Sequence, residues 1–272
     1  MTYPNFLIVG GRRSGTTSLY KYLKATDGIF MPDKKYITFF KTDDPNRLTE
    51  KQYLSYYSAV NNEKLIGEAN ATYLDDPESP RLIKEKIPNA KIIILLRNPV
   101  DRTHSDYLSS LSKNQITDSL EDIIKQEHEI LKRGLYYEQV KRYYDNFGKE
   151  NVGIWFTEDL KNKNKRKDTL LEIFNFLGIH SELPAICNEE YNNYRLSKNI
   201  ITSLILKYGY LGKFIPYSIR EKIYNAMLNN IKKPVLSDDL RKKMEDYFYN
   251  DTQKLIMLTG ITEPFNWNIN KR

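Results

Sequence analysis

The chain has 272 residues, 40% of them hydrophobic and 28% charged, and its 42 Lys and Arg against 35 Asp and Glu give a formal charge of +7. This composition excludes a disordered tail, permits a buried core and favours anionic ligands. The single cysteine, Cys187, excludes an internal disulfide and favours a reducing, cytoplasmic compartment, and three dispersed histidines give no metal-ligand spacing, so no metal is expected.

Four short apolar segments are expected to form strands. Residues 91–96 are apolar at nearly every position, which is typical of a central strand in a parallel sheet that is covered on both faces. A short apolar run at 6–9 and two weaker patterns at 65–67 and 152–155 predict three more strands. Because helical patterns separate these segments, the expected fold class is α/β, with a central, mostly parallel sheet flanked by helices in three layers.

Helix ends can be read in the later part of the chain. Residues 118–121 have capping-box spacing and open an apolar stripe that runs toward Gly134. A second stripe ends at Gly178, and a third spans 237–260. The charge run 161–167 is expected to be a solvated loop.

A single domain, residues 1–272, is expected, with a core of about 1–180 and a helical C-terminal region of about 190–272. The chain starts without a leader pattern and has no run of about 18 apolar residues, so a soluble protein is expected. Residues 200–215 are apolar but interrupted by two lysines, which favours a buried amphipathic helix and, at most, peripheral membrane contact.

Residues 10–18, Gly-Gly-Arg-Arg-Ser-Gly-Thr-Thr-Ser, lie between the first expected strand and a helix. Glycines, arginines and hydroxyls at a helix N-terminus provide free N–H groups, a positive dipole end and cationic side chains, which together form a phosphate cradle. The alternative is a glycine-rich turn with solvated arginines. The residues expected to bind phosphate are Arg12, Arg13, Ser14, Gly15, Thr16, Thr17 and Ser18.

The same segment can be compared with the P-loop of nucleoside triphosphatases. Gly10 and Gly15 keep the P-loop spacing, but Thr16 stands where the lysine that contacts the γ-phosphate belongs. The expected fold is therefore P-loop-like, and an NTP-dependent kinase is the weaker alternative. A kinase would also need magnesium and a Walker-B-like aspartate, whereas the strand 91–96 is followed by Arg97.

A second phosphate site is expected directly after the strand 91–96. Arg97 lies at the carboxyl edge of the sheet, and Ser105 lies about two turns into a helix if Pro99 opens that helix. The two side chains could converge on one anion only across a bend or the helix face. The alternative is that Arg97 pairs with Asp101 and that Ser105 faces solvent.

Glu68 follows the strand 65–67 and is the candidate general base. Ligands of open parallel sheets gather outside the carboxyl ends of the strands, so the phosphate cradle, Arg97 and Glu68 are expected on one edge. A carboxylate there can accept a proton from an acceptor hydroxyl if burial raises its pKa from about 4.3 toward neutrality. The alternative is an ion pair with Arg13 or Lys35.

A non-catalytic anion-binding or nucleic-acid-binding protein is another alternative, because the chain combines a positive charge with 21 tyrosines. These residues are spread over expected core faces and loops without a recognisable binding module, so no nucleic acid is expected as a partner. The tyrosine-rich region 191–217 is expected to pack helices rather than to cover an acceptor cleft.

Taken together, these segments resemble the sulfotransferases that use 3′-phosphoadenylyl sulfate (PAPS), above all the heparan-sulfate-type and related bacterial glycan enzymes. The likeness spans about residues 6–178, with a fainter continuation to Trp267. Residues 13–17 are similar to the family's loop around the 5′-phosphosulfate, and Arg97 and Ser105 match the arginine and serine that hold the 3′-phosphate. Two phosphate motifs in the correct order are more specific than either alone.

The resemblance also implies the catalytic residues and the acceptor. Glu68 falls where the glycan sulfotransferases carry their catalytic glutamate, and Lys35 resembles the lysine that helps to hold the sulfate. Arg13 replaces the family's catalytic lysine, and Tyr36 stands where glutamate is common. Because arginine keeps its proton, Arg13 can only stabilise charge on the departing phosphate, or else Lys35 supplies a proton. The expected reaction is metal-free transfer of a sulfuryl group from PAPS to a hydroxyl or amino group of a glycan.

Overall fold

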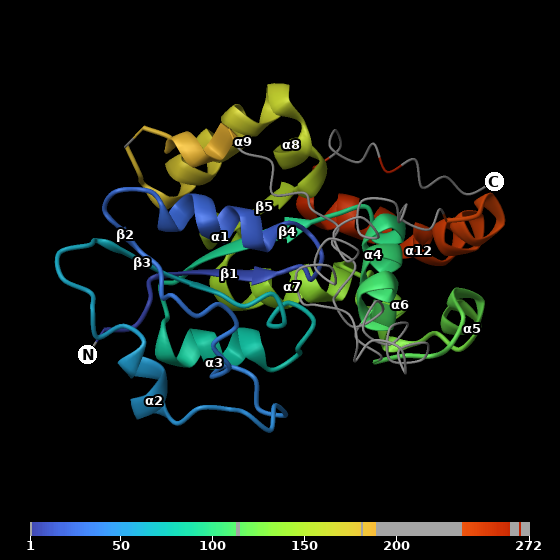
Figure 1. The fold of residues 1–272 in the computed structure, drawn as a ribbon, viewed down its shortest axis with the longest axis horizontal. Coiled ribbons are helices and arrows are strands. Elements are labelled where there is room, and N and C mark those ends of the chain that lie inside the picture. Colours follow the sequence, from blue (N-terminus) through green and yellow to red (C-terminus); the bar gives the residue numbers. More distant parts are fainter. Residues whose placement is uncertain (1, 113–114, 181, 189–235, 262–266, 268–272) are drawn as a thin grey trace, which may run out of the picture.

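Five parallel strands form a central sheet in the order β2-β3-β1-β4-β5 (Figure 1). The computed structural model describes residues 2–112, 115–180, 182–188, 236–261 and 267. This sheet confirms the expected α/β class, and only the two-residue β2 is too short for its periodicity to be read. The strands are β1 (Phe6–Gly10), β2 (Ile29–Phe30), β3 (Leu65–Ala69), β4 (Lys91–Leu96) and β5 (Val152–Phe156).

Helices cover both faces of the sheet (Figure 1). On one face lie α1 (Thr16–Lys24), α8 (Thr157–Lys161) and α9 (Lys163–Leu177). On the other face lie α2 (Glu50–Ser55), α3 (Ser79–Lys86) and α7 (Tyr137–Phe147). The remaining described elements are α4 (Pro99–Ser112), α5 (Leu120–Lys125), α6 (Glu129–Lys132), α12 (Asp238–Thr259) and the short 3-10 helices η1 (Lys149–Asn151) and η2 (Ala185–Asn188).

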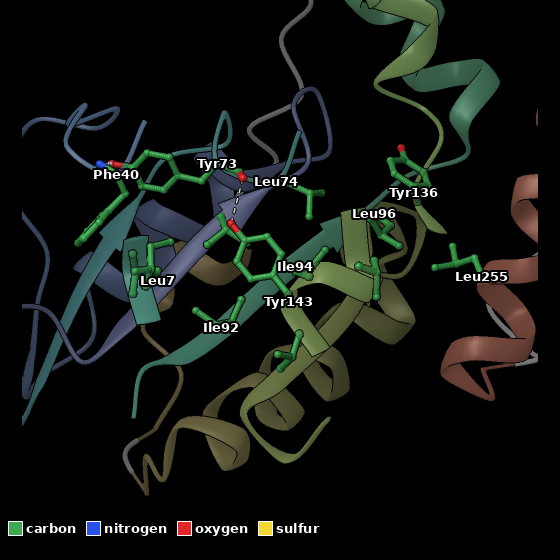
Figure 2. Packing of buried hydrophobic residues seen from close by; sticks show 14 of the residues in the cluster. Leu7, Phe40, Tyr73, Leu74, Ile92, Ile94, Leu96, Tyr136, Tyr143 and Leu255 are labelled. Carbon is green, nitrogen blue, oxygen red and sulfur yellow. Dashed lines mark hydrogen bonds between the residues drawn. The ribbon is translucent and has the colours of Figure 1, made fainter. Parts of the chain in front are cut away.

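Two apolar clusters, one on each face of the sheet, hold these layers together. Ile92 and Ile94 of β4 lie in one cluster with side chains of α3, α7 and α12 (Figure 2). Tyr143 of α7 crosses this layer and donates a hydrogen bond of 3.0 Å to the carbonyl oxygen of Tyr73 (Figure 2). Ile93 lies in the second cluster, with side chains of α1 and α9. Burial on both faces explains why 91–96 is apolar almost throughout.

Two of the expected helix ends are confirmed. α9 ends at Gly178, whose φ of 74° lies in the left-handed region that favours glycine. α12 begins after Ser237, whose hydroxyl accepts a hydrogen bond from the Leu240 N–H, and it ends at Gly260. Phe248 of α12 is fully buried in the cluster that contains β4, so this helix docks on the core.

Two other local predictions are wrong. Ser119 rather than Asp118 caps the helix predicted there, and the helix breaks in two at Glu127, which adopts a left-handed φ of 48°. The run 161–167, predicted to be a loop, is mostly helical because the side chain of Asn162 caps the start of α9. In both places the helix starts at the side chain that accepts a backbone N–H, which lies one residue later than the capping-box spacing predicts in the first case and inside the charge run in the second.

The C-terminal region is described in part. The predicted helix at 200–215 and the tyrosine-rich region 191–217 lie outside the described residues. α12 is described and packs against α4, α5 and α7. Among the helices that the structure describes, none is long and apolar enough to cross a membrane.

Candidate active site

Residues 10–17, which we call the first loop, run from the last residue of β1 into the first turn of α1 at the carboxyl edge of the sheet. Gly10 leaves no room for a side chain, because a Cβ atom there would collide with Leu74. Gly15 has a left-handed φ of 84° and directly precedes α1. No described side chain caps α1, and its first turn holds no acidic residue. The N–H groups at its start and its positive dipole end are therefore directed to an anion.

Ser14 lies inside the first loop and is 0% exposed. Its hydroxyl oxygen has no hydrogen-bond partner among the described residues. The loop itself is well anchored, since the Thr157 hydroxyl lies 2.7 Å from the Ser14 carbonyl oxygen and 2.9 Å from that of Leu96. A buried hydroxyl without a partner is costly, so it points to a ligand oxygen or donor that completes the loop.

Lys35 reaches the start of α1 from the segment 35–40, which runs along the carboxyl end of β3. Its ammonium group donates to the Thr16 hydroxyl at 3.0 Å and to the Thr17 hydroxyl at 2.8 Å. It also lies 4.6 Å from the centre of the Tyr36 ring. Burial lowers the pKa of Lys35 to about 7, so this cation can give up its proton near neutral pH.

Arg13, Arg97 and Ser105 meet at the other side of the first loop. Arg97 donates to the carbonyl oxygen of Arg13 at 3.2 Å, and the Arg13 Nε donates to the Ser105 hydroxyl at 3.3 Å. Burial, and to a smaller extent the charge of Arg13, lowers the pKa of Arg97. Asp101, the alternative partner of Arg97, instead pairs with Arg241 at 2.7 Å. The Arg13 guanidinium thus meets the Ser105 hydroxyl, and the Arg97 guanidinium meets the Arg13 backbone, so two cations and a hydroxyl lie on one side of the loop, as an anion site requires.

Arg12 and Ser18, which were also expected to bind phosphate, have other surroundings. Arg12 forms an ion pair of 3.4 Å with Asp75, which also binds Arg133 at 3.0 Å. Ser18 lies within α1 and is half-buried. Of the two loop arginines, the first is therefore neutralised by a carboxylate, whereas the second turns to Ser105.

Glu68 lies in β3 and is 1% exposed. Its Oε2 accepts hydrogen bonds from the hydroxyls of Tyr53 at 2.5 Å and Tyr57 at 3.3 Å, and its Oε1 lies 2.9 Å from the hydroxyl of Tyr73. We call these three residues the tyrosine cage. Burial raises the pKa of Glu68 to about 7, against the opposing effect of the three hydroxyls. Neither alternative ion pair of Glu68, with Arg13 or with Lys35, is formed.

The contacts between Glu68 and the tyrosine cage are not predicted by any pattern in the sequence. Tyr53 lies on α2, and Tyr57 lies four residues later in the turn that follows, so the two hydroxyls share one side of that element. Tyr73 lies in the turn after β3. The four-residue spacing was the only signal in the sequence, and it does not indicate that α2 folds against Glu68.

Comparisons with known proteins bear on the family and the fold of this chain. The family model described as the sulfotransferase domain matches residues 3–249. The crystal structure of a sulfotransferase from Alicyclobacillus acidocaldarius is 26% identical to this chain, with a TM-score of 0.72. The similarity covers 96% of this chain and 98% of that protein.

Two curated relatives are similar over different lengths. The membrane-associated sulfotransferase kil1 of Dictyostelium discoideum is 34% identical over 135 residues, which cover 47% of this chain and 29% of that protein. The bifunctional heparan sulfate N-deacetylase/N-sulfotransferase 1 of Caenorhabditis elegans is 24% identical over 270 residues, or 93% of this chain and 29% of that protein. The chain therefore spans less than a third of the length of these relatives.

Proposed function

The chain belongs to the sulfotransferase family, and we propose that it transfers the sulfuryl group of PAPS to a hydroxyl group of a saccharide. The observation that carries this proposal is the gathering of Arg13, Lys35, Arg97 and Ser105 around the first loop, where the Ser14 hydroxyl is buried without a partner among the described residues. Cationic groups on both sides of one loop suit a nucleotide that carries two separate anionic groups.

The donor nucleotide fits these groups at both of its anionic ends. The N–H groups at the start of α1, the Ser14 hydroxyl and Lys35 would hold the 5′-phosphosulfate. The guanidinium of Arg97 and the hydroxyl of Ser105 would hold the 3′-phosphate. When bound, PAPS supplies a sulfuryl group that is already activated by its bond to a phosphate oxygen.

In the transfer step, a bond forms between the acceptor oxygen and sulfur while the bond between sulfur and the bridging phosphate oxygen breaks. Glu68 takes the proton of the acceptor hydroxyl, a role for which a pKa of about 7 is well matched. Lys35, whose pKa is lowered to about 7, gives a proton to the departing phosphate. Arg13 keeps its own proton, and its side chain, which contacts Ser105 in this structure, would turn to the departing phosphate to stabilise the remaining negative charge.

Access to Glu68 requires a local movement. Glu68 is 1% exposed, and the segment 35–40 wraps the hydroxyl of Tyr73, with the Ile37 carbonyl oxygen 2.6 Å from that hydroxyl. An acceptor hydroxyl therefore reaches Glu68 only when these contacts give way. We expect the segment to move when the acceptor binds.

The choice of a saccharide acceptor rests on similarity. A relative that covers 93% of this chain is named for heparan sulfate, which is a glycan. Glu68 would serve an amino acceptor as well, because an amine also loses a proton when it attacks sulfur, and the relative named for heparan sulfate is an N-sulfotransferase. An amino sugar is therefore the second acceptor of the proposal.

Incubation of the full chain with radiolabelled PAPS and a panel of glycans, lipid-linked sugars and phenols tests this function. We expect label in a saccharide, and we expect the product 3′-phosphoadenosine 5′-phosphate (PAP) to raise the melting temperature of the protein. A parallel incubation with labelled ATP and magnesium tests the kinase alternative. The proposal is wrong if no acceptor is labelled from PAPS and PAP leaves the melting temperature unchanged.

A further inference from the structure

The hydroxyl of Tyr73 contacts more groups than its one proton can serve. It lies 2.6 Å from the Ile37 carbonyl oxygen and 2.9 Å from Glu68 Oε1. The N–H groups of Phe39 and Phe40 donate to it at 3.3 and 3.4 Å, and Figure 2 shows the Tyr73 ring reaching the backbone of Phe40. A carbonyl oxygen only accepts, so a contact of 2.6 Å requires that the Tyr73 proton points to Ile37.

The contact between Tyr73 and Glu68 must then take its proton from Glu68. Two oxygen atoms 2.9 Å apart attract each other only when a proton lies between them. The Thr157 hydroxyl faces two carbonyl oxygens at 2.7 and 2.9 Å, neither of which can carry a second proton, whereas the Glu68 carboxyl group can. Oε2 of Glu68 already accepts a proton from Tyr53 at 2.5 Å, which leaves the carboxyl proton on Oε1. The geometry thus describes a neutral Glu68, and burial of this side chain favours the same form.

We propose that Tyr73 is a positioning residue that couples the charge of Glu68 to the segment 35–40. While Glu68 carries its proton, the Tyr73 hydroxyl donates to the Ile37 carbonyl and holds the segment. When Glu68 loses that proton to solvent, the Tyr73 proton turns to Oε1, and Tyr73 itself stays neutral. The Ile37 carbonyl and the Tyr73 oxygen then face each other without a proton and must separate.

The segment released in this way is the one that carries Lys35. The Ile37 carbonyl keeps a second hydrogen bond, of 3.0 Å, from the Asn70 side chain, so the movement is local rather than an unfolding. Ionisation of Glu68, which makes it a base, thereby loosens the cover that separates it from an acceptor. This consequence for catalysis rests on the proposed function, whereas the proton arrangement itself does not.

Two groups titrate near neutral pH in this region: Glu68 inside the tyrosine cage, and Lys35 at the start of the segment 35–40, whose pKa burial lowers to about 7. The cage tyrosines stay neutral, because burial and the nearby carboxyl group raise their pKa values well above the usual range. The titratable groups on the elements packed around Glu68 are Tyr53 and Tyr57 in and after α2, Tyr143 of α7, and Asp75 and Asp76 beside Tyr73, which are paired with Arg12 and Lys41.

Infrared difference spectroscopy against Glu68→Gln tests the state of the carboxyl group. We expect a protonated carboxyl band that belongs to Glu68 and disappears as the pH rises through about 7. In Tyr73→Phe the ionised carboxylate loses a donor, so the midpoint should rise by about one pH unit. Tyr57→Phe is the matched control, because its hydroxyl lies 3.3 Å from Oε2 and has no contact with Ile37, and its shift should be smaller.

An amide signal in the segment tests the coupling. Phe39-Phe40 is the only Phe-Phe pair in the sequence, so combined ¹³C-carbonyl and ¹⁵N labelling of phenylalanine isolates the Phe40 amide in a carbonyl-filtered spectrum. We expect this signal to titrate with the midpoint of the infrared band in the wild type and in Tyr57→Phe. It should lose this titration in Glu68→Gln and in Tyr73→Phe, and Lys35→Met, in which Glu68 still titrates near neutral pH but residue 35 does not, should keep it.

Two results would overturn the inference. One is a Glu68 that is ionised over the whole pH range, and the other is a Phe40 signal that titrates equally in the wild type and in Tyr73→Phe. If Tyr73→Phe does not fold, the comparison of the wild type with Glu68→Gln decides the question. Neither measurement uses PAPS or an acceptor, so a failure here is distinguishable from a failure of the proposed sulfotransferase activity.

Discussion

The first loop gathers cationic side chains and leaves the buried Ser14 hydroxyl without a described partner, whereas the tyrosine cage surrounds the one carboxyl group of Glu68 with three hydroxyls. In the first loop, a buried polar group has no described partner, so the stability of the loop should depend on a bound ligand. In the tyrosine cage, the polar groups contact one another, so the stability of the cage should depend on the protonation of Glu68. The contrast separates a region for binding from a region for proton transfer.

Replacing the Glu68 carboxyl group should have the largest effect on activity. We expect it to lower the rate of transfer and to leave nucleotide affinity unchanged. Glu68→Gln keeps the shape of the neutral acid but cannot take a proton, so transfer should slow on the order of 10²-fold or more while PAP binds with unchanged affinity. Glu63→Gln, near the start of β3, is the matched control and should keep full activity. Normal turnover by Glu68→Gln would remove Glu68 from its role.

The same variant should also change how stability depends on pH. The pKa of Glu68 is about 7 in the folded protein and near its usual value of 4.5 in the unfolded chain. As the pH rises between these values the unfolded chain loses its proton first, so the wild type loses stability, whereas Glu68→Gln does not.

Between pH 5 and 8 we expect the free energy of unfolding of Glu68→Gln to rise by about 2–3 kcal/mol relative to the wild type. Urea unfolding of both proteins measures this difference. Asp251, whose pKa burial raises to about 6, is common to both and cancels. A constant difference would mean that Glu68 has the same pKa in the folded and unfolded states.

In the first loop, a smaller change should separate binding from stability. Ser14→Ala removes a buried hydroxyl without a described partner, so the free energy of unfolding should stay the same or increase by up to about 1 kcal/mol, while PAP binding weakens roughly tenfold. Ser79→Ala is the control, because the Ser79 hydroxyl lies 2.7 Å from the Phe40 carbonyl oxygen and 2.6 Å from Asp76. It should lower stability by about 1–3 kcal/mol. If Ser14→Ala and Ser79→Ala lost equal stability, the Ser14 hydroxyl would have a partner within the protein and would not be kept for a ligand.

The binding region was more predictable from the sequence than the proton-transfer region, for a physical reason. β4 is buried on both faces, which makes 91–96 apolar almost throughout and identifies Arg97 at its end. The close approach of Leu74 requires a glycine at position 10, and the left-handed backbone before α1 favours a glycine at position 15. The two glycines therefore make the first loop recognisable in the sequence. Features that depend on the local backbone, such as a buried strand or a tight turn, can be predicted from one sequence.

The tyrosine cage leaves no such signal. Tyr53 meets Glu68 only because α2 packs against the sheet beside β3, and this packing is a tertiary event that no local pattern encodes. The same limit applies to Arg13 and Ser105, which are 92 positions apart and whose direct contact could not be read from their spacing. The sequence predicts that Glu68 directly follows a strand, whereas β3 continues through Glu68 to Ala69, and the burial of Glu68 comes from the fold.

The central claim is that one doubly phosphorylated adenosine spans the first loop and Arg97. Calorimetry with PAP and with adenosine 5′-phosphate tests it directly, using the wild type, Arg97→Ala and the control Arg81→Ala, an exposed arginine of α3 that pairs with Glu78 and Glu85. We predict that the wild type and the control bind PAP more tightly by about 1.5–3 kcal/mol and that Arg97→Ala loses this preference. Equal affinity of the wild type for both nucleotides, or an undiminished preference in Arg97→Ala, would contradict the account.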